Sequence, residues 1–593
     1  MEALGWEQLD ILLISGDAYV DHPAFAPALL GRWLLAHGFK TGIISQPDWK
    51  TNPPADLLGM GRPRLFAGIT AGSLDSMLAH YTAFRKKRKD DAYTPGGQAG
   101  ARPNRASLVY TGMARQAFPG LPIVLGGIEA SLRRISHYDF WSDSLRKSIL
   151  LDSKADLLIY GMGELSLLEL ARRADRLERQ APADYLAGSI ALAENCKDIQ
   201  GIVFTGEKED ITDQLRSLHL PSHQEILDDP KYLIQATLDL ELQVHQGCRT
   251  AVQETDGRLV LLNPPSPPLS QEEMDRLYSL PFARAAHPSY KQPIPALEML
   301  KTSITSHRGC GGGCSFCSLA LHQGRKISSR SETSILNEIR EMLKKLPKGR
   351  RTRRRGLAIS DIGGPTVNMW GACCQFTPES CTRASCLFPT ICPGFMLSQS
   401  RHVEMLRKAA SEPGVSQVRI GSGLRYDLGM KEPKALAAYI EEFTGGQLKV
   451  APEHISDSVL ELMRKPSRGL FEIFLHNFVQ SSRHAGKEQY VIPYLMSAFP
   501  GCNDGDMRAM SVWLAERGQR PQQVQCFIPT PGTLATAMYY SRLNQAGKII
   551  YVARTDAERL RQHQILLGKD PLGLARRIRQ KKACPDQPDS PPK

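Results

Sequence analysis

The amino-acid sequence predicts an α/β protein in two parts: a doubly wound, Rossmann-like sheet followed by a partial (β/α)6 barrel of the TIM type. Short apolar runs alternate with helix-type patterns over residues 10–180 and again over residues 302–545. Polar or glycine-rich motifs follow most of these runs. Parallel sheets of both kinds place such motifs at the carboxyl ends of their strands, where ligands bind. The length of 593 residues is ample for this architecture.

In the first part, residues 1–190, buried strands are expected wherever an apolar run of four to six residues ends in glycine or a polar residue. The expected strands are 10–15, 40–45, 65–68, 123–125 and 157–160. Helices are expected at 27–37 and 165–177. The candidate ligand residues beyond the strand ends are Asp17, Asp21, His22, Gly126, Gly127 and Glu164.

Residues 191–298 lose this alternation and contain the proline run 263–269, so we expect a connector there. The alternation returns over residues 299–545, the expected barrel. Its strands are expected at 302–306, 357–360, 417–420, 448–450, 490–496 and 523–527. Its helices are expected at 333–346, 401–411, 433–444, 456–464, 468–485 and 504–518. Residues 546–593 form a C-terminal extension whose end, 581–593, has the composition of a disordered tail.

Composition excludes several classes of protein. Charged residues make up 23% of the chain and hydrophobic ones 42%, as in ordinary globular proteins. No apolar run reaches the ~20 residues that span a bilayer, and the acidic start lacks the features of a signal peptide. We therefore expect a cytoplasmic protein with no membrane partner. Its 13 cysteines are then metal or catalytic ligands and not a disulfide framework.

The net charge of +13 is compatible with nucleic-acid contact. Much of the excess is local, in the runs 85–89 and 344–355. Such runs are typical of solvated faces, and these contain no aromatic residues on which bases could stack. Nucleic acid therefore stays an alternative partner.

The chain is organised around the stretch 307–317, in which Cys310, Cys314 and Cys317 have the spacing C-x3-C-x2-C. Three thiolates this close can hold three corners of a [4Fe–4S] cluster and leave one iron open for a ligand. The surrounding glycines allow the backbone to wrap around the cluster, and Phe316 would cover it. The alternatives are a zinc knuckle built on Cys314 and Cys317, or unrelated buried cysteines.

This stretch resembles the C-x3-C-x-aromatic-C signature of the radical S-adenosylmethionine (SAM) superfamily. The motifs Asp-Ala-Tyr-Thr-Pro-Gly-Gly, Asn-Pro-Pro-Ser-Pro-Pro, Ser-Asp-Ile-Gly-Gly-Pro-Thr and Ile-Pro-Thr-Pro-Gly-Thr further resemble the YgiQ-like branch of that superfamily, from about residue 7 to 570. The resemblance implies that SAM binds the open iron and is cleaved to a 5′-deoxyadenosyl radical. It also implies an electron donor such as flavodoxin or ferredoxin, and it leaves the substrate open.

The layout of residues 299–545 is similar to the radical SAM barrel, which implies a SAM site. By position, the resemblance assigns it to Phe316, Gly363, Gly364, Ser422, Arg425, Glu453 and Ile528. The glycines would receive the amino group, Ser422 and Arg425 the carboxylate or the substrate, and Ile528 the adenine. Pro365 stands where many members have a glutamate. Loop capping or a surface ion pair is the alternative role for each lone side chain.

The N-terminal part resembles the cobalamin-binding domains that precede some radical SAM enzymes, through Gly126-Gly127 and Gly161-Met-Gly-Glu164. The Asp-x-His-x-x-Gly motif that supplies a cobalt ligand is absent, since the chain reads Asp21-His22-Pro23. We therefore expect a Rossmann-like domain without cobalamin, with a cobalamin-bound domain as the alternative.

A second cysteine group lies in the insertion 370–394. Cys374, Cys381, Cys386 and Cys392 form a candidate second metal site, with Cys373 as a spare. Four thiolates suit structural zinc or an auxiliary iron–sulfur cluster; redox-active thiols are a third interpretation.

The leading hypothesis is thus a radical SAM enzyme with an unidentified substrate. The rivals are a radical SAM enzyme that modifies tRNA or another RNA, and a non-catalytic, zinc-dependent nucleic-acid-binding protein.

Overall fold

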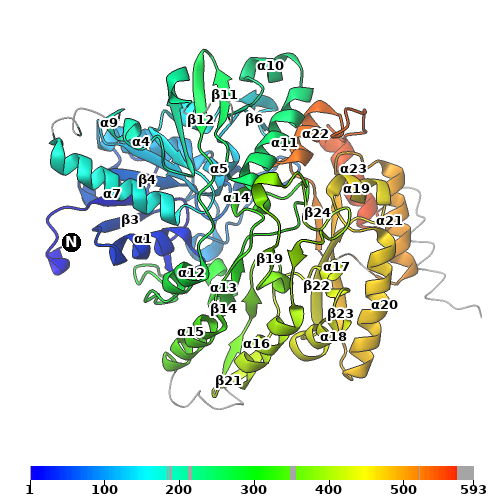
Figure 1. The fold of residues 1–593 in the computed structure, drawn as a ribbon. Helices are drawn as coiled ribbons and strands as arrows, with labels where there is room; N and C mark the ends of the chain where they lie inside the picture. Colours follow the sequence, from blue (N-terminus) through cyan, green and yellow to red (C-terminus); the bar gives the residue numbers. More distant parts are fainter. Residues whose placement is uncertain are drawn as a thin grey trace, which may run out of the picture.

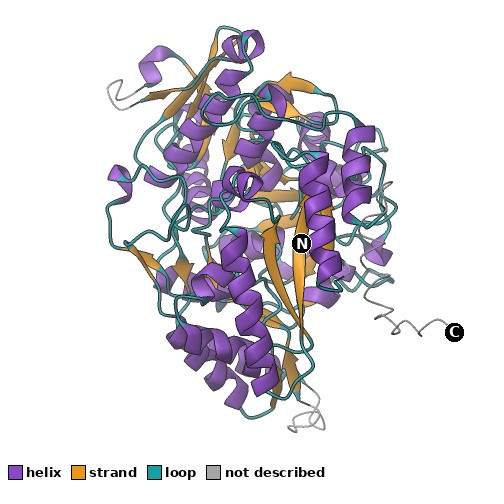
Figure 2. Ribbon diagram, turned by 90° about the vertical axis from the view of Figure 1, so that its right-hand side faces the viewer, coloured by secondary structure: helices purple, strands orange, loops and turns teal. Residues whose placement is uncertain are grey.

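The computed structural model describes residues 2–182, 185, 190–211, 217–346, 356–519, 521 and 523–569. Figure 1 shows the N-terminal part in blue to cyan beside a second α/β unit in green to orange. In Figure 2 the strands run through the interior and most helices lie outside them. The tail 581–593, Cys584 and most of the basic run 344–355 are outside the described residues.

A nine-stranded sheet forms the N-terminal part, in the order β10-β11-β12-β9-β8-β5-β4-β1-β3. Its five strands β3, β1, β4, β5 and β8 are parallel. These are β1 (Ile11–Ser15), β3 (Thr41–Ser45), β4 (Phe66–Thr70), β5 (Ile123–Gly126) and β8 (Leu157–Ile159). Each was expected from its apolar run, and β1 is buried over its whole length. Continuous apolar runs are the pattern of a sheet covered on both faces.

Alternate residues of β1 belong to different cores. Ile11 and Leu13 lie in the core that includes Leu29 of α1 (Ala26–Ala36) and Leu167 of α7 (Glu164–Gln180). Leu12 and Ile14 lie in the core that includes Tyr110 of α4 (Ala106–Ala117). Because successive strand residues point to opposite faces, helices cover both faces of the sheet. This is the doubly wound arrangement that the sequence predicts.

Part of the segment expected as a connector belongs to this sheet. Its strands are β9 (Ile202–Gly206), β10 (Leu218–His219), β11 (Ala251–Thr255) and β12 (Arg258–Leu262). Strand β9 runs antiparallel to β8, and β12 runs antiparallel to both β9 and β11. The long helix α11 (Lys231–Gln246) lies between β10 and β11 in the chain. The proline run 263–269 follows β12 and leads towards α12 (Gln271–Tyr278).

The second unit contains parallel strands in chain order. They are β14 (Ser303–Thr305), β17 (Leu357–Ile359), β18 (Asp361–Gly363), β21 (Val415–Val418), β22 (Gln447–Glu453), β23 (Tyr490–Ser497) and β24 (Gln523–Cys526). β14 pairs with β18, β17 with β21, and β22 with β23, which pairs with β24. A parallel bridge from Leu424 to Val450 connects the β21 segment to β22. The six expected strand positions are therefore occupied, the second of them by β17 and β18 together.

Helices connect these strands as the alternation predicts. They are α15 (Glu332–Lys344), α16 (Gln399–Ser411), α18 (Pro433–Ala438), α19 (Asp457–Met463), α20 (Arg468–His484) and α21 (Asp504–Glu516). The expected helix 433–444 changes at Tyr439 into a π-helix that ends at Phe443. No described helix has the length and apolar character needed to cross a bilayer.

The C-terminal segment ties the two parts together. Helix α22 (Leu534–Ser541) contacts α11, and α23 (Asp556–Leu566) contacts α21. Arg559 of α23 is fully buried and donates hydrogen bonds to the carbonyls of Ala83 and Phe527. One arginine thereby joins an N-terminal loop to the end of β24.

Inside the N-terminal part, Arg102 lies between two buried carboxylates. Its Nη2 is 3.1 Å from Asp17 Oδ1 and 3.0 Å from Asp91 Oδ2. Burial raises the pKa of Asp17, so this carboxylate depends on the guanidinium to stay charged. Asp17 was a candidate ligand residue at a strand end, and the structure instead gives it this structural pairing.

We predict that Arg102→Met lowers the free energy of unfolding by about 3–5 kcal/mol, because two buried carboxylates lose their cation. Denaturant unfolding followed by far-UV circular dichroism measures it. Arg340→Met is the control, since its ion pair with Glu412 is half exposed and surface pairs contribute about 1 kcal/mol or less. Equal effects of the two substitutions would contradict the role of Arg102.

Candidate active site

The cysteine loop is shaped by close backbone approaches. It is bracketed by β15 (His307–Arg308) and β16 (Ser328–Ser329), which pair antiparallel. A Cβ on Gly309, whose φ is +87°, would lie 2.1 Å from the carbonyl oxygen of Lys326. A Cβ on Gly313, whose φ is +56°, would lie 2.4 Å from the carbonyl oxygen of Ala384. Only glycine fits these two positions.

The three cysteines of the loop lie near one another, although the described side chains do not already form a metal site. A Cβ on Gly312 would lie 3.4 Å from the Cys310 sulfur and 3.6 Å from the Cys314 sulfur, so both thiols border this glycine. Burial, with the nearby Cys314 and Cys310 thiols, raises the pKa of Cys317 to about 12. Burial also raises the pKa of Cys310. These thiols are therefore protonated at neutral pH unless a metal centre binds them as thiolates.

Charged side chains border the cysteines. The Arg425 Nη1 lies 3.6 Å from the Cys314 sulfur, and the Arg425 Nε lies 2.9 Å from Asp427 Oδ1. The Lys465 Nζ lies 3.8 Å from Glu453 Oε1 and 6.0 Å from the ring centre of Phe316. The structure therefore brings Arg425, Glu453 and Phe316 to the cysteine loop, as the sequence predicts.

Two members of this group, Asp427 and Lys465, were not predicted as site residues from the sequence. Asp427 follows Arg425 by two residues, and that spacing was a usable signal for a side-chain pair. Lys465 follows the helix α19 and lies near Glu453 only because of the fold. Glu453 itself has a φ of +68°, uncommon for a side chain of this size. Burial raises its pKa.

The remaining predicted SAM residues take two different places. A Cβ on Gly363 would lie 2.4 Å from Ser422 Oγ, and a Cβ on Gly364 would lie 2.6 Å from the His307 carbonyl oxygen. The Ser422 hydroxyl donates to Asp361, whose Oδ1 also accepts from the amide of Gly421 at 2.7 Å. Ser422 is thus already bound to a carboxylate. Ile528 packs against a small core of Ala83, Ala498, Cys526 and Ala553, where the end of the second unit meets an N-terminal loop.

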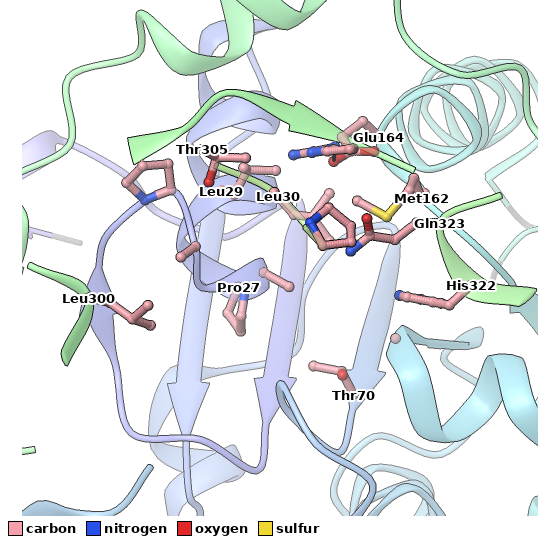
Figure 3. Close-up of a pocket in the computed structure, with 18 of the residues that line it drawn as sticks. Pro27, Leu29, Leu30, Thr70, Met162, Glu164, Leu300, Thr305, His322 and Gln323 are labelled. Carbon is pink, nitrogen blue, oxygen red and sulfur yellow. Dashed lines mark hydrogen bonds and ion pairs between the residues drawn. The ribbon is translucent and has the colours of Figure 1, made fainter. Parts of the chain in front are cut away.

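A large cavity of about 1030 Å³ separates the strand ends of the N-terminal sheet from the second unit. Figure 3 shows its wall, with Pro27, Leu29 and Leu30 of α1 on one side and Met162 and His322 on another. Gly363, Gly364 and Ser422 line it from the second unit, and Gly126, Gly127 and Glu164 line it from the first. The strand-end candidates Asp21 and His22 instead serve local contacts, Asp21 with Arg32 and His22 with the amide of Ala24.

A buried ion pair joins the two parts at this cavity. Arg308 Nη1, one residue before the cysteine loop, lies 2.6 Å from Glu164 Oε1. Its Nε donates to the hydroxyl of Tyr278 at 3.1 Å. The second oxygen of Glu164 has no hydrogen-bond partner among the described residues. His322 Nδ1 lies 3.1 Å from Ser131 Oγ, and burial lowers the pKa of His322 to about 4, so its ring is neutral at pH 7.

The second cysteine group lies against the first. The amide of Cys386 donates to the carbonyl of Gly311 at 2.9 Å, and Ser385 Oγ donates to the carbonyl of Gly312 at 2.6 Å. Burial raises the pKa of Cys386 to about 11, and the thiols of Cys381, Cys374 and Cys392 add to this rise. Strand β19 (Cys373–Cys374) pairs with β20 (Phe395–Met396). Within the described ranges, no three His, Cys, Asp or Glu side chains are grouped so as to hold a metal ion.

Comparison with known proteins identifies the family to which the chain belongs. A family model described as Radical SAM N-terminal matches residues 1–303, about half of the chain. The chain therefore belongs to the radical SAM enzymes. Within them it belongs to the UPF0313 family. A UPF0313 protein of Geobacter sulfurreducens is 45% identical over 95% of this chain and 90% of its own length. One of Thermotoga neapolitana is 44% identical over 96% of this chain and 97% of its own length.

Two solved structures are also similar. The radical SAM methyltransferase TsrM of Kitasatospora setae, with cobalamin and a [4Fe–4S] cluster bound, has a TM-score of 0.47 at 13% identity. That similarity covers 89% of this chain and 76% of TsrM. The cobalamin-dependent SAM radical enzyme OxsB has a TM-score of 0.45 at 11% identity, over 90% of this chain and 55% of its own. Both of those structures contain cobalamin.

We predict that Gly313→Ala lowers the iron content of the anaerobically purified protein by at least half. A methyl group at this position meets the Ala384 carbonyl and must displace the loop. Iron and acid-labile sulfide per chain measure the effect.

Gly324→Ala is the matched control. Gly324 lies in the same loop with φ of +81°, but a Cβ there meets nothing within 4 Å. Equal iron loss in both variants would show that the positive φ, and not the contact with Ala384, is the constraint.

Proposed function

We propose that Cys310, Cys314 and Cys317 hold a [4Fe–4S] cluster whose open iron binds SAM, and that the chain is a radical SAM enzyme acting on a substrate still to be identified. The single observation that carries the proposal is the position of the Cys310 and Cys314 sulfurs beside Gly312, with Cys317 close to both and Arg425 Nη1 3.6 Å from the Cys314 sulfur. When bound and reduced, such a cluster supplies the electron that cleaves SAM to a 5′-deoxyadenosyl radical.

The protein's own residues bind and orient in this scheme. Arg425, held by Asp427, offers a cation beside the cysteines for a carboxylate group. Lys465 and Glu453 offer a second cation and an acid on the same side. Gly363 and Gly364 leave backbone exposed at the large cavity, where no side chain would fit. Phe316 packs edge-to-face on Phe499, with ring centres 6.3 Å apart, and excludes water from this side of the loop.

We place the substrate in the large cavity, because it opens between the strand ends of both parts and is mostly apolar with a few convergent polar groups. An electron donor such as flavodoxin or ferredoxin would reduce the cluster. The reduced thiols that this chemistry needs fit a cytoplasmic location. RNA as substrate remains the alternative that the basic runs suggest.

The first test is the cleavage of SAM. Anaerobically purified wild-type protein should contain about four irons per chain for one cluster and release 5′-deoxyadenosine from SAM in dithionite. Cys314→Ala should lose most of the iron and reduce 5′-deoxyadenosine to background. Cys248→Ala, at an exposed cysteine that belongs to neither group, should keep both the iron and the 5′-deoxyadenosine. Zinc in place of iron, without SAM cleavage, would overturn the proposal.

A second candidate function, cobalamin binding, is favoured by the size of the cavity. Its ~1030 Å³ reaches the upper end of the ~300–1000 Å³ that small-molecule sites usually occupy. Gly126, Gly127 and Leu30 would surround the ligand from the N-terminal part. His322 lines the same cavity with a neutral imidazole, the form that binds metals.

The cobalamin candidate predicts about one cobalt per chain in protein reconstituted with hydroxocobalamin and desalted. Leu30→Trp narrows the cavity and should lower the cobalt content at least fivefold. Leu35→Trp on the same helix is the control, because Leu35 is 41% exposed and does not line the cavity. If the reconstituted wild-type protein holds less than a tenth of one cobalt per chain, cobalamin is excluded as the ligand of this cavity. The substrate is then its occupant.

A further inference from the structure

A small cavity of about 210 Å³ lies behind the cysteine loop. Its walls are α11, the short helix α14 (Leu319–His322) and the cysteine-rich insertion. Gly313, Cys314 and Cys317 line it from the loop, whereas Cys310 and Arg425 do not. The cavity therefore borders two of the three loop cysteines but is not lined by Arg425 or Glu453.

Arg325 is a buried cation at this cavity. It is 7% exposed, and its Nη1 has no hydrogen-bond partner within the described ranges. A buried guanidinium normally pairs with an anion, since leaving a charge unpaired away from water costs several kcal/mol. The structure thus has a buried positive charge that no described carboxylate pairs with directly, although Glu241 lies near it.

Two further groups at the cavity have unused hydrogen-bonding atoms. Arg464 Nη1 donates to Glu241 at 2.8 Å and to the Gly313 carbonyl at 3.2 Å, while its Nη2 has no partner. His245 Nδ1 has no partner either. Arg464 is 4% and His245 7% exposed. Arg325, Arg464 and His245 come from three separate segments, so no single helix or loop explains their convergence.

The charges around the cavity leave a positive excess. Glu241 is already bonded to Arg464, and the other acid on the wall, Asp239, has Arg249 as its charged neighbour. Arg383 also lines the cavity, and its guanidinium donates to the carbonyls of Ser385, Phe388 and Thr390. Glu241 also lies near enough to attract Arg325, but its ion pair is with Arg464, so two buried guanidinium groups share one carboxylate and one positive charge remains.

We propose that this cavity is an anion-binding site for a phosphate-type oxyanion, held by Arg325 and Arg464 with His245 as a further donor. Arginines present several N–H groups in a planar fork that matches such oxyanions. The volume lies below the ~300 Å³ of drug-sized sites, so the anion is free or is the end group of a small metabolite. The other candidate counter-ions, the thiols of Cys386 and Cys381, are near Arg325 but do not line the cavity.

Isothermal titration of the anaerobically purified protein tests the proposal, with sodium phosphate or sulfate against chloride at constant ionic strength. We expect about one anion per chain.

Arg325→Gln should weaken anion binding at least about tenfold, the effect of one charged hydrogen bond. The anion affinity of Arg325→Lys should lie between those of the wild type and Arg325→Gln. Arg340→Gln removes the same charge from an exposed ion pair and should bind the anion like the wild type. Methyl phosphate binding as tightly as phosphate would identify an end group, and much weaker binding a free anion.

Absence of phosphate and sulfate binding in the wild type would overturn the site, as would equal affinity in Arg325→Gln. A third outcome is that Arg325→Gln loses iron while the wild type binds no anion. This result would mean that Arg325 supports the cysteine groups, and it would also overturn the anion site. If Arg325→Gln does not fold, the wild-type melting temperature decides: it should rise by about 2 °C in saturating phosphate over chloride, and no rise contradicts the site. The assay needs no SAM cleavage, so its failure is distinct from failure of the radical SAM proposal.

Discussion

The site depends on the contact between the cysteine loop and the insertion that covers it. Gly309 approaches the backbone at Lys326, and Gly313 approaches the backbone at Ala384, closely enough to exclude any side chain. Hydrogen bonds from Cys386 and Ser385 to the carbonyls of Gly311 and Gly312 hold the same contact from the other side. The loop can therefore present three thiols near one another although it has little regular structure. The raised pKa values of Cys310 and Cys317 mean that a bound metal, not the protein alone, would keep these two as thiolates.

The second constraint is the junction of the two α/β parts. Arg308 immediately precedes the loop and pairs with Glu164 at the start of α7, so the loop is anchored to the N-terminal sheet. Arg559 joins the parts again at the C-terminal side. The Arg308–Glu164 pair lies in the wall of the large cavity and holds the two parts together there. A substrate or cofactor bound there would touch both parts, which explains why one chain carries both.

Much of this could be predicted from the sequence, for reasons that differ between elements. Strands such as β1 and β4 are buried on both faces, so their apolar runs are continuous and unmistakable. Strands β11 and β12 are partly exposed at one side of the sheet, and their weaker pattern was interpreted as a connector. Cys310, Cys314 and Cys317 could be singled out because they lie close together in the sequence. Lys465 and Arg325 were not, since only the tertiary fold gives them their neighbours, and the bond from Ser422 to Asp361 is equally invisible in a one-dimensional pattern.

The central claim is that the three-cysteine loop holds a cluster with one iron open to SAM. Electron paramagnetic resonance of the dithionite-reduced, anaerobically purified protein tests it most directly, with spectra recorded before and after addition of SAM. The account predicts a reduced [4Fe–4S] signal in the wild type whose g values shift when SAM is added, because SAM binds the open iron. A cluster signal that SAM leaves unchanged, or no cluster signal in protein that contains its full complement of iron, would contradict it.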